Sequence, residues 1–214
     1  MNDERVLAVV RGDDSRTHGE RMPGEMARAL DEAGVSRQAI NLLAVATGPG
    51  AFTGLRIGLA AMQGLAMTLH KPVVGVSALD ALTEQAAEGD ADLILPWMDA
   101  QRGDVFATLI ERASRAVIEP PTASSPDALI AAWLPHLAHR SAIFIGDAAM
   151  RDAEAIARLS TGQWAARAPE PLAPQIARLA RLRAREGEAG SPHALEPIYV
   201  RRPDAEIERE RRHR

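Results

Sequence analysis

Apolar residues recur along this chain at two spacings, one typical of helices and one typical of buried strands. Two segments carry them three and four residues apart, residues 20–33 and the stretch after residue 54, so one face of each predicted helix is apolar. These faces carry Met22, Met26 and Leu30 on the first helix and Leu55, Leu59 and Met62 on the second. Gly34 follows the first stripe and can end that helix.

Short apolar runs predict strands that alternate with helices. The predicted strands are 5–10, 42–47, 72–76, 92–98, 104–110 and 141–145, and further helices are predicted from Ser77, from Ser125, over 148–159 and over 171–186. A polar loop with prolines is expected after residue 110. This alternation indicates an α/β fold. We place an N-terminal lobe at 1–98, a C-terminal lobe at 99–200 and a charged tail at 201–214.

A glycine-rich turn is expected between the strand at 42–47 and the second helix. It begins the run Gly48-Pro49-Gly50-Ala51-Phe52-Thr53-Gly54-Leu55-Arg56-Ile57-Gly58. Gly48 and Gly50 can adopt positive φ angles, and the proline between them stiffens the turn. Thr53 is the expected N-cap of the helix, and Arg56 is placed to pair with a nearby acidic group. The run has neither the Gly-Lys-Ser/Thr of a P-loop nor the glycine spacing of a dinucleotide site.

Two further segments, together with this glycine run, carry a family resemblance. They are Asp99-Ala100-Gln101-Arg102-Gly103-Asp104-Val105-Phe106 and Glu196-Pro197-Ile198-Tyr199-Val200-Arg201. The three segments resemble, in order, the glycine motif, the Asp-Ala-Arg-x-Gly-Glu-Val-Tyr hairpin and the C-terminal Glu-Pro-x-Tyr-Leu-Arg of the bacterial TsaB (YeaZ) family. That family takes part in tRNA threonylcarbamoyladenosine biosynthesis. In the glycine run, Ala51 stands where the family usually has serine and Leu55 where it usually has valine.

The resemblance implies the fold of the actin-like ATPase superfamily, with two ribonuclease H-like lobes. Family members begin with a strand that carries Asp-Thr-Ser and a second hairpin strand, but no Asp-Thr-Ser precedes Thr47 here, and 6–10 is more similar to the family's third strand. The first lobe is therefore expected to lack its N-terminal β-hairpin and any phosphate contact from it. Two interpretations of the glycine turn stay open: a turn that serves only packing, and a former nucleotide surface that now meets a partner subunit.

Two acidic residues lie within the second motif. Asp99 and Asp104 enclose Arg102 and Gly103 in the predicted hairpin. Two such acids can act as general acid and base, or bind Mg²⁺ together with waters. Aspartate and glycine are also the usual residues where a chain reverses, and we favour this second interpretation.

The histidines do not form a convincing metal site. The resemblance points to the catalytic sister family, TsaD, in which two histidines on a helix hold a metal ion. Here His18 is followed by Met22 at the corresponding helical spacing. His136 and His139 are spaced as at the polar end of a helix. We therefore expect no metal and no other cofactor.

Composition narrows the function classes further. The formal net charge is −4, which argues against a surface built mainly to hold nucleic acid. The chain has no cysteine, which excludes disulfides and thiolate chemistry. Lys71, the only lysine, precedes Pro72 at the start of a predicted strand. We find no signal peptide and no apolar run of membrane-spanning length, so a cytoplasmic protein without a membrane partner is expected.

By resemblance, the chain is interpreted as a non-catalytic subunit that supports TsaD in threonylcarbamoyl transfer to the adenosine beside the anticodon of tRNA. The wider assembly would include the ATPase TsaE, and tRNA would be contacted only indirectly. The two apolar helix faces are the candidate interface, either with TsaD or with a second copy in a homodimer. The alternative is an active enzyme of the same superfamily, either an ATP-dependent transferase or a TsaD-like threonylcarbamoyltransferase. That alternative needs a phosphate-binding first hairpin or a histidine pair.

Overall fold

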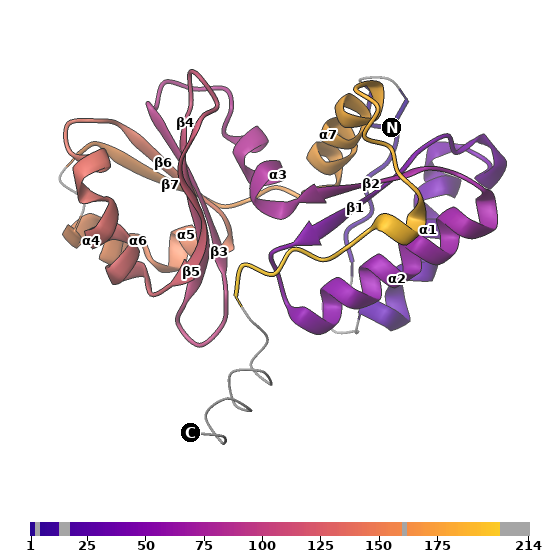
Figure 1. Cartoon of the computed structure of the whole chain (residues 1–214), viewed down its shortest axis with the longest axis horizontal. Helices are drawn as coiled ribbons and strands as arrows, with labels where there is room; N and C mark the ends of the chain where they lie inside the picture. Colours follow the sequence, from indigo (N-terminus) through magenta and orange to yellow (C-terminus); the bar gives the residue numbers. More distant parts are fainter. Residues whose placement is uncertain (3–4, 13–17, 160–161, 202–214) are drawn as a thin grey trace. The chain divides into compact units, whose positions relative to one another are not determined.

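The computed structural model describes residues 1–2, 5–12, 18–159 and 162–201, and the chain divides into two compact units (Figure 1). The first unit comprises Met1–Ala81 and Pro171–Ile198, and the second comprises Leu82–Glu170 and Tyr199–Arg214. Apart from Arg201, the predicted charged tail falls on residues 202–214, which lie outside the described residues.

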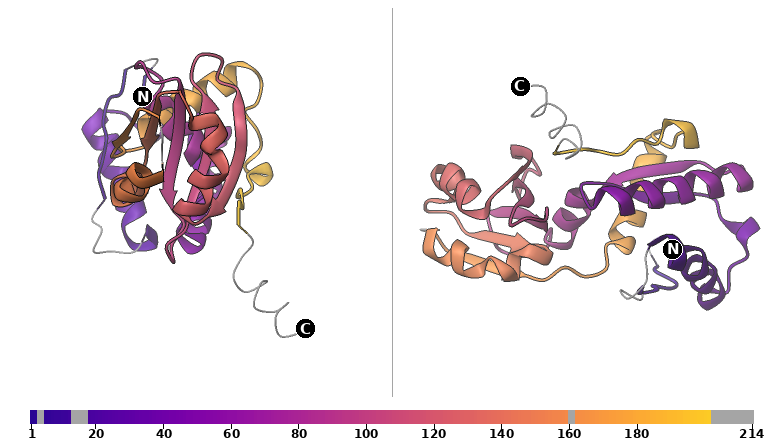
Figure 2. Two further views of the ribbon diagram at one scale, coloured as in Figure 1. Left: turned by 90° about the vertical axis from the view of Figure 1, so that its left-hand side faces the viewer. Right: turned by 90° about the horizontal axis from the view of Figure 1, so that it is seen from below.

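The first unit is built around two parallel strands that a helix connects. The strands are β1 (Leu43–Gly48) and β2 (Val73–Ser77), and the connecting helix is α2 (Phe52–Leu69). Helix α1 (His18–Ala33) packs against α2, and α7 (Ala173–Arg185) packs against both strands (Figure 1 and Figure 2). Two short 3₁₀ helices, η1 (Arg37–Ala39) and η2 (Pro192–Ala194), complete the unit together with the start of α3 (Ala78–Gln85).

The apolar side chains on both faces of β2 explain why helices pack on both faces of this strand pair. Val74 and Val76 lie in one buried cluster with Ile176 of α7, whereas Val73 lies in another with Ala66 of α2. Successive side chains of a strand point to opposite faces. The run of valines in β2 is therefore buried on both faces, as expected for parallel strands covered by helices.

The second unit is a five-stranded mixed sheet with helices on one face. Its strands are β3 (Leu93–Asp99), β4 (Val105–Glu111), β5 (Val117–Ser124), β6 (Ala142–Ile145) and β7 (Trp164–Arg167), in the spatial order β5-β4-β3-β6-β7. The β3–β4 and β4–β5 pairs are antiparallel, and the β3–β6 and β6–β7 pairs are parallel. The covering helices are α4 (Pro126–Leu137), α5 (Asp147–Arg151) and α6 (Ala153–Leu159) (Figure 1).

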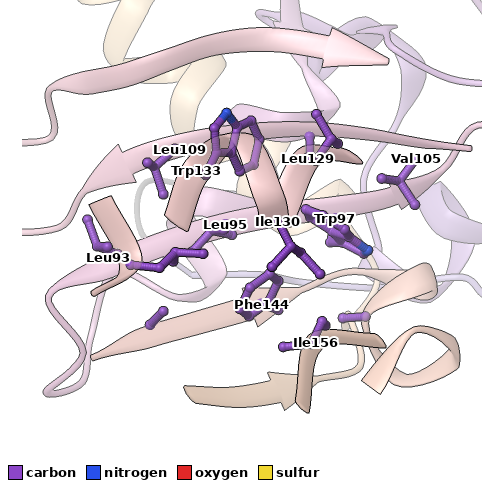
Figure 3. Close-up of a cluster of buried hydrophobic side chains, with 14 of the residues drawn as sticks. Leu93, Leu95, Trp97, Val105, Leu109, Leu129, Ile130, Trp133, Phe144 and Ile156 are labelled. Carbon is purple, nitrogen blue, oxygen red and sulfur yellow. The ribbon is translucent and has the colours of Figure 1, made fainter. Parts of the chain in front are cut away.

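Three aromatic rings fill the centre of the second core (Figure 3). Trp97 on β3 is fully buried, and its ring meets Phe144 edge-on at 5.3 Å and Trp133 at 6.2 Å between centroids. Edge-to-face pairs at such distances add to the free energy gained from burial alone. Trp97 and Phe144 come from the adjacent strands β3 and β6, so this aromatic core lies against the middle of the sheet.

Most predicted elements are present, but two predictions near the first unit are wrong. The segment 5–10, predicted as a strand, has no regular secondary structure at residues 6–10, and Arg5 forms only an isolated bridge with Asn2. Thr53 is not an N-cap, because α2 begins at Phe52 and its N-cap is Ala51, which makes no side-chain capping bond. The helix predicted from Ser77 is confirmed as α3, and the Oγ atom of Ser77 accepts from the backbone N–H of Leu79 at the start of this helix.

Two strands of the second unit were not predicted. The segment expected as a proline-containing loop is β5, which lies at the edge of the sheet and contains Pro120 and Pro121. Proline is tolerated in an edge strand because one side of that strand needs no ladder hydrogen bonds. The other edge is β7, a strand of only four residues. The helix predicted over 148–159 is divided into α5 and α6 at Asp152.

The boundary predicted at residue 98 also differs from the division in the structure. Strand β3 hydrogen-bonds to β4 and β6, so the chain enters the second unit before this strand, at Leu82. The segment Pro171–Ile198 returns to the first unit, because α7 packs against β1 and β2. A single boundary cannot represent this crossing and return.

Candidate functional site

The glycine turn lies at the end of β1 and is covered by its own chain. Gly48 has a φ of 111°, and a Cβ atom there would lie 2.8 Å from the carbonyl oxygen of Ile198 and 3.1 Å from Cδ2 of Leu55. The backbone N–H of Ile198 donates to the carbonyl oxygen of Thr47 at 2.7 Å. Gly48 therefore adopts the positive φ that the sequence allows. Gly50 does not, and it has open space where its Cβ would be.

The C-terminal segment that covers this turn is fixed to α2 and the first core. The side-chain Nε2 of Gln63 on α2 donates to the carbonyl oxygens of Pro192 and Leu195, each at 3.1 Å. The Leu195 side chain packs against the buried cluster of Leu43 and its neighbours. The third motif is thus bonded to Thr47, directly before the first motif, and its Ile198 lies close to Gly48 of that motif.

The exposed beginning of α2 carries an aromatic–cation pair. The guanidinium carbon of Arg56 lies 3.9 Å from the centroid of the Phe52 ring, and Phe52 is 39% exposed. Such stacking is favourable by about 0.5–1 kcal/mol at an exposed position. Thr53 and Gly54 follow in the first turn, where Thr53 is exposed and Gly54 half-buried.

The second motif forms the predicted hairpin between β3 and β4. The Oδ1 atom of Asp99 accepts from Nη1 of Arg151 at 2.5 Å and from the backbone N–H of Gln101 at 3.2 Å. The backbone N–H of Asp99 donates to Oδ1 of Asp147 at 2.9 Å. At the other end of the turn, Asp104 accepts from Nη1 of Arg201 at 3.0 Å. Both carboxylates of the hairpin therefore hold the turn in place.

A second layer of hydrogen bonds connects this hairpin to the core. Asp152 accepts from the indole Nε1 of buried Trp97 at 2.9 Å and from Nε of Arg151 at 2.7 Å. Hydrogen bonding to Asp152 raises the pKa of Arg151, and the bond to Asp99 acts in the same direction. Arg151 therefore stays charged and links the two carboxylates. The arrangement supports the interpretation of Asp99 and Asp104 as turn residues.

Sequence reasoning did not identify Asp147, Arg151 or Asp152. All three follow β6, which pairs in parallel with β3, and the carboxyl ends of neighbouring parallel strands meet at one edge of a sheet. The dipeptide Gly146-Asp147 directly after an apolar run was the available signal. The prediction of one continuous helix over this region obscured it.

The histidine pair has an ordinary structural role. The Nε2 atom of His136 lies 3.2 Å from Oε1 of Glu119, and His139 follows the end of α4 with a φ of 63°. Within the described part of the chain, no group of three or more histidine, aspartate and glutamate side chains could hold a metal ion. None of its helices is both long enough and apolar enough to cross a membrane.

The candidate interface residues on α2 lie on its inner face. Leu59 is only 4% exposed, and Met62 packs against the first core. Leu55 contacts the glycine turn, as described above. The prediction that Leu59 offers a surface to a partner is thus wrong, because helical spacing alone does not show which way an apolar stripe faces. The exposed face of α2 instead carries Phe52, Arg56, Ala60, Gly64 and Met67, which we call the outer α2 face.

The candidate residues on α1 are all half-buried. Met22 packs against α2, where its Cε would lie 3.7 Å from a Cβ atom on Gly58. Met26 and Leu30 follow on the same helix at helical spacing. Met22 therefore contributes to packing within the first unit. Part of each of the three side chains nevertheless stays accessible to solvent.

Comparison with known proteins gives a consistent set of relatives. Residues 9–209 match the family model described as TsaD, tRNA N6-adenosine threonylcarbamoyltransferase. The chain is 29% identical over 194 residues to the tRNA threonylcarbamoyladenosine biosynthesis protein TsaB of Bacillus subtilis, covering 89% of this chain and 82% of that protein. It is 35% identical over 103 residues to TsaB of Escherichia coli, covering 48% of this chain and 45% of that protein.

A solved structure shares the fold as well. YeaZ from Pseudomonas aeruginosa superposes with a TM-score of 0.69 at 26% sequence identity, covering 85% of this chain and 84% of that one. The resemblance carried by the three sequence motifs is therefore matched by sequence similarity over most of the chain and by the arrangement of its elements.

Proposed function

Because the chain belongs to the TsaB (YeaZ) family, with the α/β fold of the actin-like ATPase superfamily and its ribonuclease H-like lobes, we propose that it is a non-catalytic subunit of the tRNA threonylcarbamoyladenosine pathway. Its partner would be the TsaD-type transferase, which it supports during transfer of the threonylcarbamoyl group to the adenosine next to the anticodon. The ATPase TsaE would act through the same assembly, in the cytoplasm.

The covered glycine turn is the observation that carries this proposal. In a nucleotide-binding turn, glycines allow a phosphate to approach the backbone closely. Here the close approach at Gly48 is made by the carbonyl oxygen of Ile198, from the same chain. A carbonyl oxygen in that position repels an anion. Packing of the C-terminal segment thus gives a reason for the glycine at residue 48, which supports a structural rather than a phosphate-binding use of the turn.

The hairpin carboxylates support the same interpretation. General acid–base catalysis needs carboxylates that can reach a substrate proton. Asp99 and Asp104 each accept hydrogen bonds from an arginine, and Asp99 also accepts one from the backbone. These bonds support a role of both side chains in holding the turn.

The outer α2 face is the surface that we propose for the partner. It exposes Phe52 and Met67 at its two ends, with Ala60 and Gly64 between them, and small residues allow a second helix to approach closely. Methionine adapts to different partners because its side chain is unbranched and polarizable. The partner would be TsaD, and a second copy of this chain could occupy the same face in a homodimer. Contact with tRNA would be indirect, consistent with the net charge of −4.

A binding assay with matched methionine variants tests the proposal. Met67 on the outer α2 face is 49% exposed and Met150 on α5 is 56% exposed, so Met67→Glu and Met150→Glu place the same charge at similar exposure. We expect Met67→Glu to weaken binding of the TsaD subunit from the same organism by tenfold or more, whereas Met150→Glu leaves it unchanged. Equal affinities of the two variants for TsaD would show that the interface does not include the outer α2 face.

An activity assay separates the non-catalytic role from the enzymatic alternative. We expect the purified chain alone neither to hydrolyse ATP nor to form threonylcarbamoyladenosine, and to increase product formation when it is added to TsaD. Turnover by the isolated chain that Asp99→Ala abolishes would establish the enzymatic alternative instead.

A further inference from the structure

An open pocket lies on the first unit, where the C-terminal end of α2, the start of β2 and η2 meet. Every residue that lines it belongs to this unit. Its volume is about 450 Å³, which lies within the range of small-molecule sites. None of the three motifs of the sequence contributes to its lining, so the contacts described above do not account for it.

The titratable side chains that line the pocket are all basic. They are His70, Lys71 and His193, and Lys71 is the only lysine of the chain. No described acidic residue lines the pocket, although the chain has 29 acidic residues against 25 lysines and arginines. A pocket lined by charges of one sign concentrates ligands of the opposite sign. The lining therefore favours an anion.

These basic side chains are not used by the structure itself. Within the described part of the chain, none of the three has a side-chain hydrogen bond or an ion pair. Lysine and histidine at a helix end often bind the last carbonyl oxygens of that helix. Here backbone groups do so, because the N–H of Lys71 donates to Ala66 at 3.0 Å and the N–H of His70 donates to Met67 at 3.3 Å.

The wall opposite α2 is fixed by backbone hydrogen bonds. Gly190 and Val73 exchange two of these bonds, each at 3.3 Å. The side chain of Gln63 on α2 binds the carbonyl oxygen of Pro192, and the Oγ atom of Ser191 accepts from the backbone N–H of His193 at 3.4 Å. The hydroxyl proton of Ser191 remains available to a ligand. The pocket is therefore formed before any ligand enters it.

We propose that this pocket binds a small organic phosphate. The phosphate oxygens accept hydrogen bonds from the ammonium group of Lys71 and from the imidazoles of His70 and His193. The apolar body of the ligand lies against Met67 and the prolines of the lining, which a bare phosphate ion would leave uncovered. This inference goes beyond the proposed function and does not rest on it.

The end of α2 does not prevent binding of an anion. A helix C-terminus carries a partial charge equivalent to about −0.5 of an elementary charge. The single positive charge of Lys71 exceeds this value, and each histidine that takes up a proton adds another. A phosphate also offers more acceptor oxygens than a carboxylate, which suits a site with donors on several residues.

Titration of the isotope-labelled full chain with phenyl phosphate, followed by NMR, tests the proposal. At low ionic strength we expect saturable shifts of the backbone amides at 70–71 and 190–193, with a Kd of about 1 mM or lower. Inorganic phosphate and benzoate should each bind at least threefold more weakly, because the first lacks the apolar body and the second lacks the phosphate.

Matched variants locate the site. Lys71→Met keeps the unbranched side chain without its charge and should weaken binding of phenyl phosphate tenfold or more, whereas Lys71→Arg should retain binding. His70→Asn should weaken binding at least threefold. His139→Asn is its control, because His139 follows α4 with a similar φ of 63° and lies outside the pocket. Asparagine tolerates this backbone, so the histidine pair remains informative even if Lys71→Met does not fold.

Each contrary result overturns a stated part of the proposal. Absence of saturable shifts at these amides, or equal binding by Lys71→Met and the unmodified chain, refutes the site. Equal effects of His70→Asn and His139→Asn also refute it. Equal affinities for phenyl phosphate and benzoate refute the choice of phosphate, and equal affinities for phenyl phosphate and inorganic phosphate refute the role of the apolar wall.

Discussion

Replacing Gly48 with alanine should release the C-terminal segment from the end of β1. The substitution places a Cβ atom 2.8 Å from the carbonyl oxygen of Ile198, a distance at which the backbone must move. It also forces an L-residue to adopt a φ of 111°, in a region that side chains rarely occupy. The neighbouring hydrogen bond from Ile198 to Thr47, at 2.7 Å, would be the first to break.

The expected loss of stability follows from these two effects. An L-residue held in a left-handed conformation costs about 1–2 kcal/mol. Loss of one backbone hydrogen bond adds about 1 kcal/mol. For a chain of this size, about 1 kcal/mol shifts the melting temperature by roughly 2–4 °C, so Gly48→Ala should lower it by roughly 5–10 °C.

Gly50→Ala is the matched control for this measurement. It lies two residues away in the same turn, has no positive φ, and has no atom within 4 Å of its would-be Cβ. Differential scanning calorimetry should therefore show little change for Gly50→Ala. Limited proteolysis should cut Gly48→Ala faster than the unmodified chain at residues 196–201. Equal melting temperatures for the two variants, or for Gly48→Ala and the unmodified chain, would contradict this explanation.

Two further predictions concern the second unit. Asp152→Ala should destabilise the chain by about 1–3 kcal/mol, because the fully buried indole of Trp97 loses its hydrogen-bond acceptor. Asp152→Asn keeps an acceptor oxygen, so unfolding in urea should show a smaller loss of stability for this variant. Hydrogen bonds from the backbone and hydroxyl of Ser141 lower the pKa of Asp92 below its ordinary 3.8, so its stabilising contribution is present above pH 3.8 and is lost as the pH falls through the lowered value. Asp92→Asn should therefore be less stable than the unmodified chain at neutral pH, and acid titrations of the two should converge below pH 3.8.

The sequence predicted those elements whose signals are local. Apolar runs gave β1, β2 and the β3–β4 hairpin, because buried strands of this length need little more than β-branched and aliphatic residues. Pro120 and Pro121 concealed β5, since proline argues against a central strand but not against an edge strand. Strand β7, with four residues, is too short to show a period.

The contacts of the candidate site were harder to predict from the sequence, because they join residues far apart in the chain. Helical spacing placed Leu55, Leu59 and Met62 on one face of α2, but it could not show that this face lies against the core. Likewise, the glycine pattern allowed positive φ at both Gly48 and Gly50. Only the position of Ile198, 150 residues later, distinguishes the glycine that the turn requires from the one that it does not.

The three motifs that carry the family resemblance are connected by these long-range contacts. Ile198 of the third motif binds Thr47 beside the first motif, within the first unit. Arg201 of the third motif binds Asp104 of the second motif, within the second unit. The C-terminal motif therefore contributes the backbone of Ile198 to the glycine turn and the guanidinium group of Arg201 to the hairpin. A change at Gly48, Asp104 or Arg201 would disturb a contact between two of the motifs, which gives a physical reason for these residues to occur together in one chain.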